Sequence, residues 1–473
     1  MINYIITKNW NDLEKFEIKA DLMKDRVLSS TDPLPESFPG KCYYFSSEGC
    51  DNNDGLSPEK SLKSLEMVEQ LPLEPGDAVL FRRGDLFRGS VNCNKNGITF
   101  SAWGSGDKPV ICGSKRNYAD PSLWVKSSVP GIWECTVPLK NVGVVSFDHD
   151  PRIIGKYDAL LGFSVPHEPG MEQIPLHLKN DLEFFSDLDT DKFYLKSEQN
   201  PGERFKRIEI GENVHLFCFR QGLREDLTVD NLHITMTGAH GISFLTHNRG
   251  EVRNCIIDYV GGSVLWRKGG SSITSAMNVR FGNAVEVYGG CNGFKVWNNW
   301  IYQIYDTGIT HQCHWDKENC YTQENVEYFD NLVEYCFWFF EYYNTDNKYS
   351  ITRNIHVHDN FCRFGGCGWG CTPERWMKSS MYSFMKKADE TENYLTEKNI
   401  FQFTRGIIYK HIPPITPEGA LIFKNNVYIQ YARERFALWD EKEIPFTRED
   451  TAAFAENVLK EEGGTYIEVP YTK

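Results

Sequence analysis

Three carboxylates in the middle of the chain have a spacing that suits chemistry. Glu286 and Asp306 lie 20 residues apart, and Glu341 follows in the next repeating unit. A pair of carboxylates is the usual equipment for hydrolysing a glycosidic bond, with one as general acid and the other as nucleophile or base. Like charges held close together also raise one pKa, which keeps a general acid protonated near neutral pH. These three residues are therefore the candidate catalytic groups.

The 20-residue spacing is close to one coil of a parallel β-helix, in which neighbouring coils lie about 4.8 Å apart. Aligning the units puts Glu286, Thr310 and Glu341 at one level, with Asp306 four residues earlier in its own coil. Carboxylates on adjacent coils, about 5 Å apart, suit a retaining glycosidase, whereas a separation near 10 Å suits an inverting one. The sequence leaves open which carboxylate has which role.

Polar and aromatic residues around the carboxylates are candidates for binding a sugar, because sugar faces stack on aromatic rings and hydroxyls bond to polar groups. Most aromatic residues of a β-helix fill the core instead, so fewer than half of those in this region are expected to touch ligand. The candidate substrate-binding residues are His240, His311, Arg280, Tyr288, Tyr305 and Trp338.

Structural roles compete with these assignments. His240, at a turn one unit before Glu286, is equally well explained as a core histidine with satisfied hydrogen bonds. The carboxylates would have no catalytic role if they formed ion pairs with Arg280, Arg267 or Lys268. The grouping of three acidic residues beside histidine and aromatic residues favours the functional interpretation.

A repeated unit must position these residues. From about residue 214, an Asn or an Asp-Asn pair precedes an apolar doublet at intervals of 23 to 45 residues. The turn positions are Asn231, Asn254, Asn298-Asn299, Asp330-Asn331, Asp359-Asn360, Asn399 and Asn425-Asn426. An irregular period with a fixed turn residue is typical of a parallel β-helix, whose stacked coils bury a continuous core while loops leave from the binding face.

The asparagine at each turn has two physical uses. It tolerates the left-handed backbone region, and its side-chain amide can bond the equivalent groups of the coils above and below. The predicted fold class is therefore all-β: a parallel β-helix, right-handed as such folds are, with a small antiparallel β-sandwich inserted into it.

The domain boundaries follow from where the repeat stops. Residues 1–39 are a polar extension ending in a proline-rich linker, 40–130 the first part of the β-helix, and 131–213 the inserted β unit. Residues 214–430 are the main coils. Residues 431–473 are a cap whose helix begins at a capping pair, Thr447 and Asp450, and ends at Gly463-Gly464.

Composition limits the partners and the compartment. The net charge of −14 argues against nucleic acid or an anionic membrane as the main partner. The start lacks a basic region followed by an apolar run, and no apolar stretch approaches the roughly 20 residues of a membrane span. The fourteen cysteines are scattered singly, which suits reduced thiols in the cytoplasm. We expect a glycan substrate, and homo-oligomerisation stays open.

No metal or cofactor is expected at the site. His311 to Cys320 is rich in metal-ligand types but lacks a paired CxxC, and Cys367 to Cys371 is better explained as a glycine-rich loop. Asp51 to Gly55 begins like a calcium loop, but its twelfth position is Leu62 where glutamate is required. A turn is the preferred interpretation, with calcium as the alternative.

Several stretches resemble a known family. The segments 43–58, 75–85 and 101–111 resemble the opening of pectate-lyase-like right-handed β-helix proteins of carbohydrate-using bacteria. The segments 200–209 and 305–311 look like glycosidase-type members that carry an inserted β-sandwich, similar to the family 120 β-xylosidases. The resemblance covers most of residues 40–430. It implies a catalytic Asp and Glu from nearby coils facing the inserted domain, roles that Asp306 with Glu286 or Glu341 would fill.

Three functions remain in competition. The leading one is an exo-acting glycoside hydrolase, xylosidase-like in its resemblance, that cleaves an oligosaccharide. The second is a polysaccharide lyase, which abstracts a proton next to a uronate carboxyl and would use Arg280, His311 or His240, with calcium as an aid. The third is a glycan-binding module without catalysis.

Overall fold

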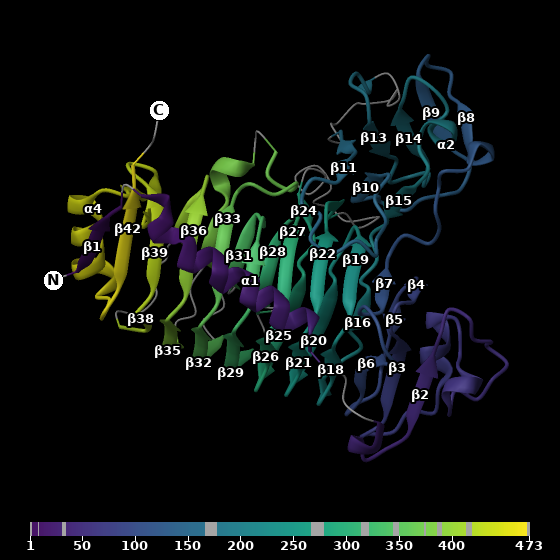
Figure 1. Cartoon of the computed structure of the whole chain (residues 1–473), viewed down its shortest axis with the longest axis horizontal. Helices are drawn as coiled ribbons and strands as arrows, with labels where there is room; N and C mark the ends of the chain where they lie inside the picture. Colours follow the sequence, from purple (N-terminus) through teal and green to yellow (C-terminus); the bar gives the residue numbers. More distant parts are fainter. Residues whose placement is uncertain are drawn as a thin grey trace.

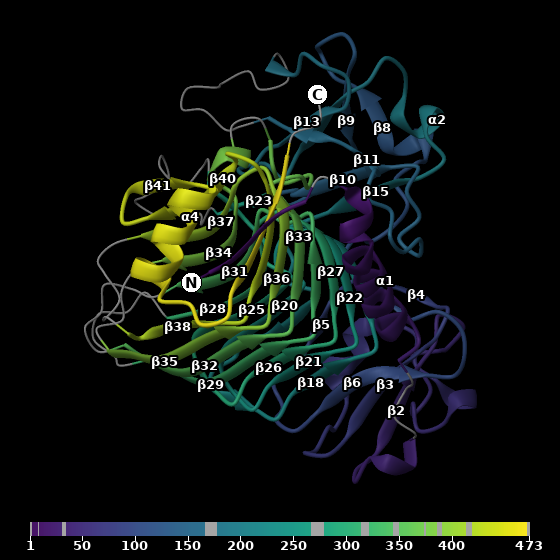
Figure 2. The ribbon, with the colours of Figure 1, turned by 60° about the vertical axis from the view of Figure 1, so that its left-hand side comes forward.

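The computed structural model describes residues 2–7, 9–30, 35–165, 177–265, 279–313, 321–343, 350–372, 375–385, 390–412 and 419–470. Its coils stack along the long axis of the molecule, from β2 at one end to β42 at the other (Figure 1). Each full coil contributes one strand to each of three parallel rows, which line three sides of the coils (Figure 2). The predicted parallel β-helix is confirmed.

We call the first row of strands the α1 row, because helix α1 (Glu14–Leu28) covers it. In order of pairing, its strands are β4 (Leu86–Arg88), β7 (Val110–Cys112), β19 (His233–Thr237), β22 (Ile256–Val260), β27 (Trp300–Ile304), β30 (Leu332–Glu334), β33 (Phe361–Gly365), β36 (Ile400–Thr404), β39 (Val427–Tyr431), β42 (Thr465–Val469) and β1 (Asn3–Ile6).

The β28 row lies on the second side of the coils. Its strands are β5 (Val91–Asn92), β16 (Phe217–Phe219), β20 (Ile242–Asn248), β25 (Val285–Asn292), β28 (Thr307–Gln312), β31 (Trp338–Tyr343), β34 (Ser380–Met385), β37 (Ile407–Ile412), β40 (Arg435–Trp439) and the antiparallel β41 (Lys442–Pro445), with β17 (Arg224–Glu225) beside the end of β20.

The β29 row forms the third side. Its strands are β2 (Cys42–Phe45), β3 (Ala78–Arg82), β6 (Thr99–Trp103), β18 (Thr228–Asp230), β21 (Glu251–Arg253), β26 (Lys295–Trp297), β29 (Thr322–Phe329), β32 (Ile351–His358), β35 (Glu390–Glu397) and β38 (Leu421–Lys424).

Alternation along each strand builds the interior. Successive side chains of a strand point to opposite faces, so every second residue enters the core of the coils. In β25 the inward residues Val285 and Val287 are buried, and they belong to one continuous hydrophobic cluster that runs through the stack. The residues between them, such as Glu286, point outward, where they can contact a ligand.

The turn asparagines form a buried ladder. The Nδ2 of Asn299 donates to Oδ1 of Asn331, and Asn331, Asn360, Asn399 and Asn426 continue the series at 2.9–3.2 Å. The predicted bonding between coils is confirmed, but the two uses of asparagine fall on different residues. The positive φ belongs to the position before each ladder residue, as in Asn298 (52°) and Asp330 (56°).

The N-terminal segment is more ordered than the predicted polar extension. Strand β1 pairs in parallel with β42 at the far end of the helix, and α1 runs back along the α1 row (Figure 1). Its buried residues Phe16, Ala20, Met23 and Val27 are spaced by three or four, as one helical face requires, and pack on that row. The sequence analysis did not predict this helix, because its apolar stripe is short and the rest of the helix is polar.

The inserted unit contains two sheets that share one hydrophobic core. The first has the order β12 (Phe163–Ser164), β13 (Glu183–Ser186), β14 (Phe193–Lys196), β9 (Ile132–Cys135) and β8 (Trp124–Lys126); the second has β11 (Leu160–Leu161), β10 (Val144–Phe147) and β15 (Ile208–Gly211). Strand β8 precedes the predicted boundary at residue 131. The β12–β13 pair is parallel, so the unit is not wholly antiparallel.

The C-terminal cap covers the last coil. Thr447 Oγ1 accepts from the backbone N–H of Asp450 and begins α4 (Arg448–Phe454), as predicted. A π-helical turn, η8 (Ala455–Leu459), follows and ends at Lys460 in the left-handed conformation, three residues before the predicted glycine stop. Phe454 and Leu459 join the main core, so the cap seals the open end of the stack.

Short helical turns complete the described elements. They are η1 (Trp10–Leu13), η2 (Pro35–Ser37), η3 (Pro58–Lys60), η4 (Leu65–Gln70), η5 (Pro121–Leu123), α2 (Pro201–Arg204) and η7 (Trp376–Lys378). Among the helices that the structure describes, none is both long and apolar enough to cross a membrane.

Candidate active site

A cavity of about 930 Å³ opens on the β28 row. All three candidate carboxylates line it. The other lining residues are Asn213, His215, Arg220, His240, Val264, Leu265, Val279, Arg280, Phe281, Asn283, Tyr288, Tyr305, Gln312, Phe337, Trp338, Tyr343, Arg375, Lys378, Met385 and Lys410.

Strand register puts two outward stripes in the floor of this cavity. Glu286 pairs with Thr310, and Thr310 pairs with Glu341, which confirms the predicted level. Two residues further along, Tyr288, Gln312 and Tyr343 form the second stripe. Because the period of a strand is two, both stripes face the same way. Glu286 and Glu341 are two coils apart, so their Cα atoms are separated by about 10 Å.

Glu286 is held in its ionised form by several donors. Arg220 Nη1 lies 2.8 Å from Oε1, while His240 Nε2 and Asn283 Nδ2 each lie 2.9 Å from Oε2. Burial would raise the pKa of this carboxyl, but His240 and Arg220 outweigh it and lower the pKa to about 2. Glu286 is therefore a fixed negative charge at the wall of the cavity.

His240 has a defined hydrogen-bond polarity. Its Nδ1 accepts from the backbone N–H of Asn283 at 2.9 Å, so the ring proton lies on Nε2 and is donated to Glu286. The ring stacks on His215 at a centroid distance of 4.9 Å and an interplanar angle of 5°. Burial lowers the pKa of His215 to about 3, so that ring is neutral. His240 thus positions Glu286 while also lining the cavity.

Asp306 lies at the start of β28 and has a different environment. Its side chain is 18% exposed, and its nearest cation is Arg375, whose Nη2 is 3.8 Å from Oδ1. Burial raises the pKa of Asp306 to about 6, with Arg375 opposing the rise. The Arg375 guanidinium is fixed between the rings of Tyr305 and Phe337, at 4.1 and 4.0 Å from their centroids.

Glu341 has the most strongly raised pKa of the three carboxyls. Burial and the negative charge of Asp306 raise it to about 8, against the effect of hydrogen bonds from Thr310 and Thr307. Within the described residues, every hydrogen bond to this carboxyl ends on Oε2: Thr307 at 3.4 Å, Thr310 at 3.2 Å and Gln312 at 3.0 Å. Among the described residues, none donates a hydrogen bond to Oε1.

Asn283 links the carboxylates through the backbone. Its Nδ2 donates to Glu286, and its Oδ1 accepts from the backbone N–H of Thr307 at 3.1 Å. Thr307 follows Asp306 directly and reaches Glu341 through its hydroxyl. One amide therefore fixes the position of β28 relative to Glu286, and Asp306 lies at the start of this strand, on the coil between those of the two glutamates.

A short hairpin and the inserted unit build one wall of the cavity. Strands β23 (Ser263–Val264) and β24 (Arg280–Phe281) pair antiparallel. Asn141 of the inserted unit bonds both backbone groups of Val264, at 2.8 and 2.9 Å. Arg280 donates to the carbonyls of Gly262 and Val165, so it ties the hairpin to the inserted unit. The ion pairs that the sequence suggested for Arg280 do not occur among the described residues.

The aromatic candidates lie where a sugar could touch them. Tyr288 has the Arg220 guanidinium 5.5 Å from its ring centroid, and Trp338 has Lys410 Nζ at 5.1 Å. Tyr305 is mostly buried, packs against Trp369 and also lines the cavity. The structure thus places all three predicted aromatic residues in the lining.

The prediction for His311 was wrong. His311 follows the outward Thr310 and therefore points into the core, where its Nδ1 lies 3.1 Å from the hydroxyl of Tyr328 and its Nε2 lies 3.2 Å from the hydroxyl of Tyr394. Burial lowers its pKa to about 3. It does not line the cavity, because one step along a strand moves a side chain to the opposite face.

The sequence analysis did not identify the basic residues that lie beside the carboxyls and affect their pKa values. Arg220 and Arg375 lie 66 and 69 residues from the carboxylates that they contact, on parts of the chain with no repeat signal. Lys410 pairs in register with Ser383, which pairs with Glu341, so it continues the Glu286 stripe. Extending the predicted strand register by two coils would have identified Lys410 as a residue of the cavity. No local sequence pattern identifies the two arginines.

The suggested calcium loop forms a turn. The two oxygens of Asp51 accept from the backbone N–H groups of Lys63 and Ser64 and from the Ser64 hydroxyl. The segment 314–320, part of the other ligand-rich stretch, lies outside the described residues.

No model of a known protein family matches the chain, and no curated protein matches it. Solved structures do match. A structure of XylC in complex with xylose aligns over 84% of this chain and 67% of its own, at 12% identity and a TM-score of 0.50. The chain is a right-handed parallel β-helix. A structure described as a glycoside hydrolase aligns over 91% of this chain and 97% of its own (10% identity, TM-score 0.44), and a GH136 lacto-N-biosidase from Eubacterium ramulus over 92% and 68% (15%, 0.39). At these identities the likeness concerns the fold alone.

Proposed function

We propose that the chain is a retaining glycoside hydrolase in which Glu341 is the general acid and base and Asp306 is the nucleophile. The observation that carries the proposal is two carboxyls at one cavity with different neighbours: Arg375 Nη2 lies 3.8 Å from Asp306, whereas the hydrogen bonds to Glu341 come from neutral groups of the described residues. Burial raises the pKa of Glu341 to about 8 and that of Asp306 to about 6. Near pH 7 the first carboxyl is protonated and the second is ionised, which is the starting state that a retaining mechanism needs.

The reaction proceeds in two displacements. Asp306 attacks the anomeric carbon while the Glu341 proton passes to the glycosidic oxygen, so the leaving group departs neutral and a glycosyl ester forms on Asp306. The Glu341 carboxylate then takes a proton from water, and that water displaces Asp306 from the sugar. Loss of the Asp306 charge in the first step lowers the pKa of Glu341, because repulsion between them ends, and this prepares Glu341 to act as a base.

Glu286 supports the reaction without taking part in bond making. It is saturated by Arg220, His240 and Asn283, so it is a poor nucleophile, but its charge favours a positively charged transition state. Asp306 and Glu341 come from adjacent coils. Asp306 lies four residues before the level of Glu341, but the Glu341 carboxyl reaches back to the hydroxyl of Thr307, the residue next to Asp306, at 3.4 Å. This brings the two side chains towards the separation of about 5 Å that retaining enzymes use.

The shape of the cavity favours the end of a glycan as substrate. Its volume of about 930 Å³ lies in the range of about 300–1,000 Å³ typical of small-ligand sites. The inserted unit and the β23–β24 hairpin form a wall on one side, which suits exo-cleavage of an oligosaccharide. We propose that the substrate is a short imported fragment cleaved in the cytoplasm.

A screen of nitrophenyl glycosides and of plant and host oligosaccharides tests the proposal. Wild type should release the terminal sugar with retained anomeric configuration, read by NMR at early times. Asp306→Asn should lose at least about 10³-fold in rate and still bind the substrate. Equal turnover by wild type and Asp306→Asn would refute the site. Loss of turnover with retained binding would exclude a module that only binds glycans.

A lyase remains the second candidate because of Lys410. The bases first considered have other roles: His311 is in the core, and Arg280 donates to carbonyls. Lys410 lines the cavity, and burial lowers its pKa, with Glu341 opposing the change. A lysine with a lowered pKa can abstract a proton. A lyase product absorbs in the ultraviolet, so absorbance of the products on uronate-containing glycans separates the two reactions.

A further inference from the structure

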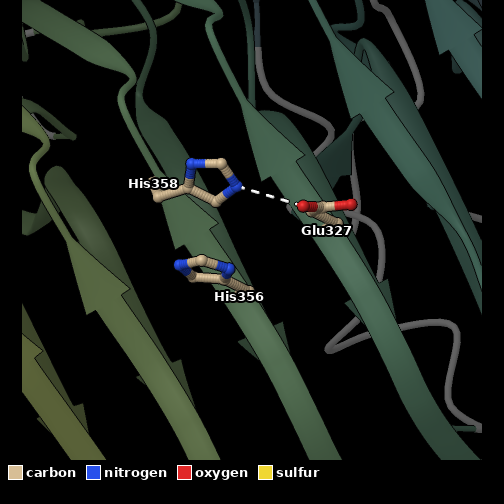
Figure 3. Close-up of side chains that lie close together, drawn as sticks. All are labelled: Glu327, His356 and His358. Atoms are coloured by element: carbon tan, nitrogen blue, oxygen red, sulfur yellow. Dashed lines mark hydrogen bonds and ion pairs between the residues drawn. The ribbon is translucent and has the colours of Figure 1, made fainter.

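A second cluster of chemical groups lies on the β29 row, away from the strands that carry the carboxylates. His356 and His358 stand two residues apart on β32, so both point outward, and Glu327 stands on the adjacent strand β29. One ligand atom from each of the three lies within 4.8 Å of the other two. Figure 3 shows the two imidazoles one above the other, beside the Glu327 carboxylate.

We propose that Glu327, His356 and His358 bind a divalent transition-metal ion of the zinc type. Two imidazoles and one carboxylate are a ligand set that zinc uses, with water in the fourth position. Two histidines separated by one residue on a strand supply a rigid pair of donors, since their side chains share a face. Hard cations such as Ca²⁺ and Mg²⁺ prefer oxygen ligands and do not suit this set.

Each histidine also has a carboxylate that orients it. Asp359 Oδ2 lies 2.8 Å from Nδ1 of His358, which directs Nε2 towards Glu327 at 3.2 Å. Glu397 Oε1 lies 3.1 Å from Nε2 of His356, which leaves Nδ1 as the ligand atom. A metal-ligating histidine commonly donates its second N–H to a carboxylate in this way, and the contact fixes its tautomer and raises its basicity.

The surroundings allow the ion to enter. The side chains of His356 and Glu327 are 33% and 31% exposed, so solvent reaches both. The rings of the two histidines are stacked at 3.9 Å, and His358 is also stacked on Phe329 at 5.1 Å, which limits their motion. Ligand atoms on a tetrahedral zinc are about 3.3 Å apart, so side-chain rotations alone can close the site.

Two lysines of the described residues oppose metal binding: Lys398, whose Nζ lies 3.9 Å from Oε1 of Glu397, and Lys295. Lys295 is the closer to a proposed ligand. Its Nζ lies 3.1 Å from Oε2 of Glu327, the oxygen that does not contact His358. That ion pair leaves Oε1 for the metal, and the carboxylates of Asp359 and Glu397 add two negative charges beside the site. The three carboxylates Glu327, Asp359 and Glu397 outnumber the two lysines, so the local charge still favours a dication.

The expected consequence of binding is structural. Glu327 belongs to one coil and the two histidines to the next, and Glu397 on β35 belongs to the coil after that. An ion at this position links successive coils on the exterior of the stack. Because it binds the native state, zinc should raise the unfolding temperature in a concentration-dependent way.

Titration of the full chain with ZnCl₂ tests the proposal. Wild type, stripped with chelator, should bind one equivalent by calorimetry, and CoCl₂ should produce the visible absorption of a tetrahedral site. The double variant His356→Gln/His358→Gln should weaken binding by more than about 100-fold, and Asp359→Asn by about 10–100-fold. His177→Gln, at an exposed histidine of the inserted unit, is the matched control and should bind as wild type does.

Two results would overturn the proposal. One is zinc binding by the double variant with the wild-type affinity and stoichiometry. The other is wild type that binds no zinc at 100 μM while its circular dichroism shows a folded chain. Glycan turnover is expected to be the same in wild type and the double variant, because the cluster lies on a different row from the cavity, so this test is independent of the catalytic assignment.

Discussion

The Nε2 of His240 donates to Oε2 of Glu286 across 2.9 Å, and the Nδ1 of the same ring accepts from the backbone of Asn283. This pair divides the carboxylates of the cavity into two kinds. Glu286 is stabilised as an anion, whereas Asp306 and Glu341 keep raised pKa values. Pairs of carboxyls whose environments separate their pKa values are typical of acid–base chemistry.

The pH profile of kcat/KM should be bell-shaped. Activity needs Asp306 ionised and Glu341 protonated, so the acidic limb is expected near pH 6 and the alkaline limb near pH 8. These values belong to the coupled pair rather than to either carboxyl alone. Initial rates from pH 4 to 10 measure both limbs. A profile that keeps rising above pH 9 would contradict Glu341 as the acid.

Arg375→Met should move the acidic limb of the pH profile of kcat/KM to higher pH. The Arg375 charge opposes the burial that raises the Asp306 pKa, so its removal lets that pKa rise further. Arg375→Lys, which keeps the charge, is the control and should leave the limb closer to its wild-type position. A profile of Arg375→Met that superimposes on wild type would show that Asp306 does not set this limb.

Glu341→Gln should stabilise the protein at alkaline pH. A carboxyl with a raised native pKa favours the protonated native state, so stability falls as pH rises from about 4.3 towards 8. The variant removes this loss, and its free energy of unfolding should exceed that of wild type by about 5 kcal/mol at pH 9, at about 1.36 kcal/mol per pKa unit, and by little at pH 4. Urea unfolding at both pH values measures the difference. Glu198→Gln, at an exposed glutamate, should show neither effect.

Glu286→Ala should lower the free energy of unfolding at neutral pH, unlike Glu341→Gln. A lowered native pKa contributes stability above about pH 4.3 that is lost as pH falls through about 2. Removing the carboxylate leaves Arg220 and His240 without their partner, which should cost about 3 kcal/mol at pH 7. Urea unfolding at pH 7 tests this, and an unchanged midpoint would contradict the role assigned to Glu286.

The asparagine ladder should be a major contributor to stability. Asn360→Ala removes a fully buried amide that bonds Asn331 and Asn399, so neighbouring polar groups lose their partners at a cost of about 2–3 kcal/mol. Asn393→Gly is the control, because it keeps the positive φ of 50° and removes only an exposed amide contact. Similar unfolding midpoints for the two variants would contradict the ladder's importance.

The sequence was informative where structure is local and repeated. The turn asparagines predicted the coils, and the coils predicted that Glu286, Thr310 and Glu341 share a level. It failed for His311, because a single step along a strand decides between cavity and core. The partners of the carboxylates, Arg220 and Arg375, come from loops whose approach depends on the complete fold.

The N-terminal helix shows a different limit. Its apolar positions had helical spacing, but the surface that buries them is built by strands hundreds of residues later, such as β33 and β36. The ion pair of Glu17 with Arg363 at 2.6 Å is one such distant contact. Local periodicity can suggest a helix of this kind, but only the finished stack shows where it lies.

The leaving-group dependence of Glu341→Gln tests the central claim most directly. Protonation by Glu341 matters most when the departing group is a poor one, so a series of aryl glycosides with leaving-group pKa from about 4 to 10 separates the roles. The account predicts that Glu341→Gln keeps near-wild-type glycosylation rates on the most acidic phenol and loses about 10²–10⁴-fold on the least acidic. Asp306→Asn should be inactive on all of them. An equal loss for Glu341→Gln across the whole series would contradict its assignment as the general acid.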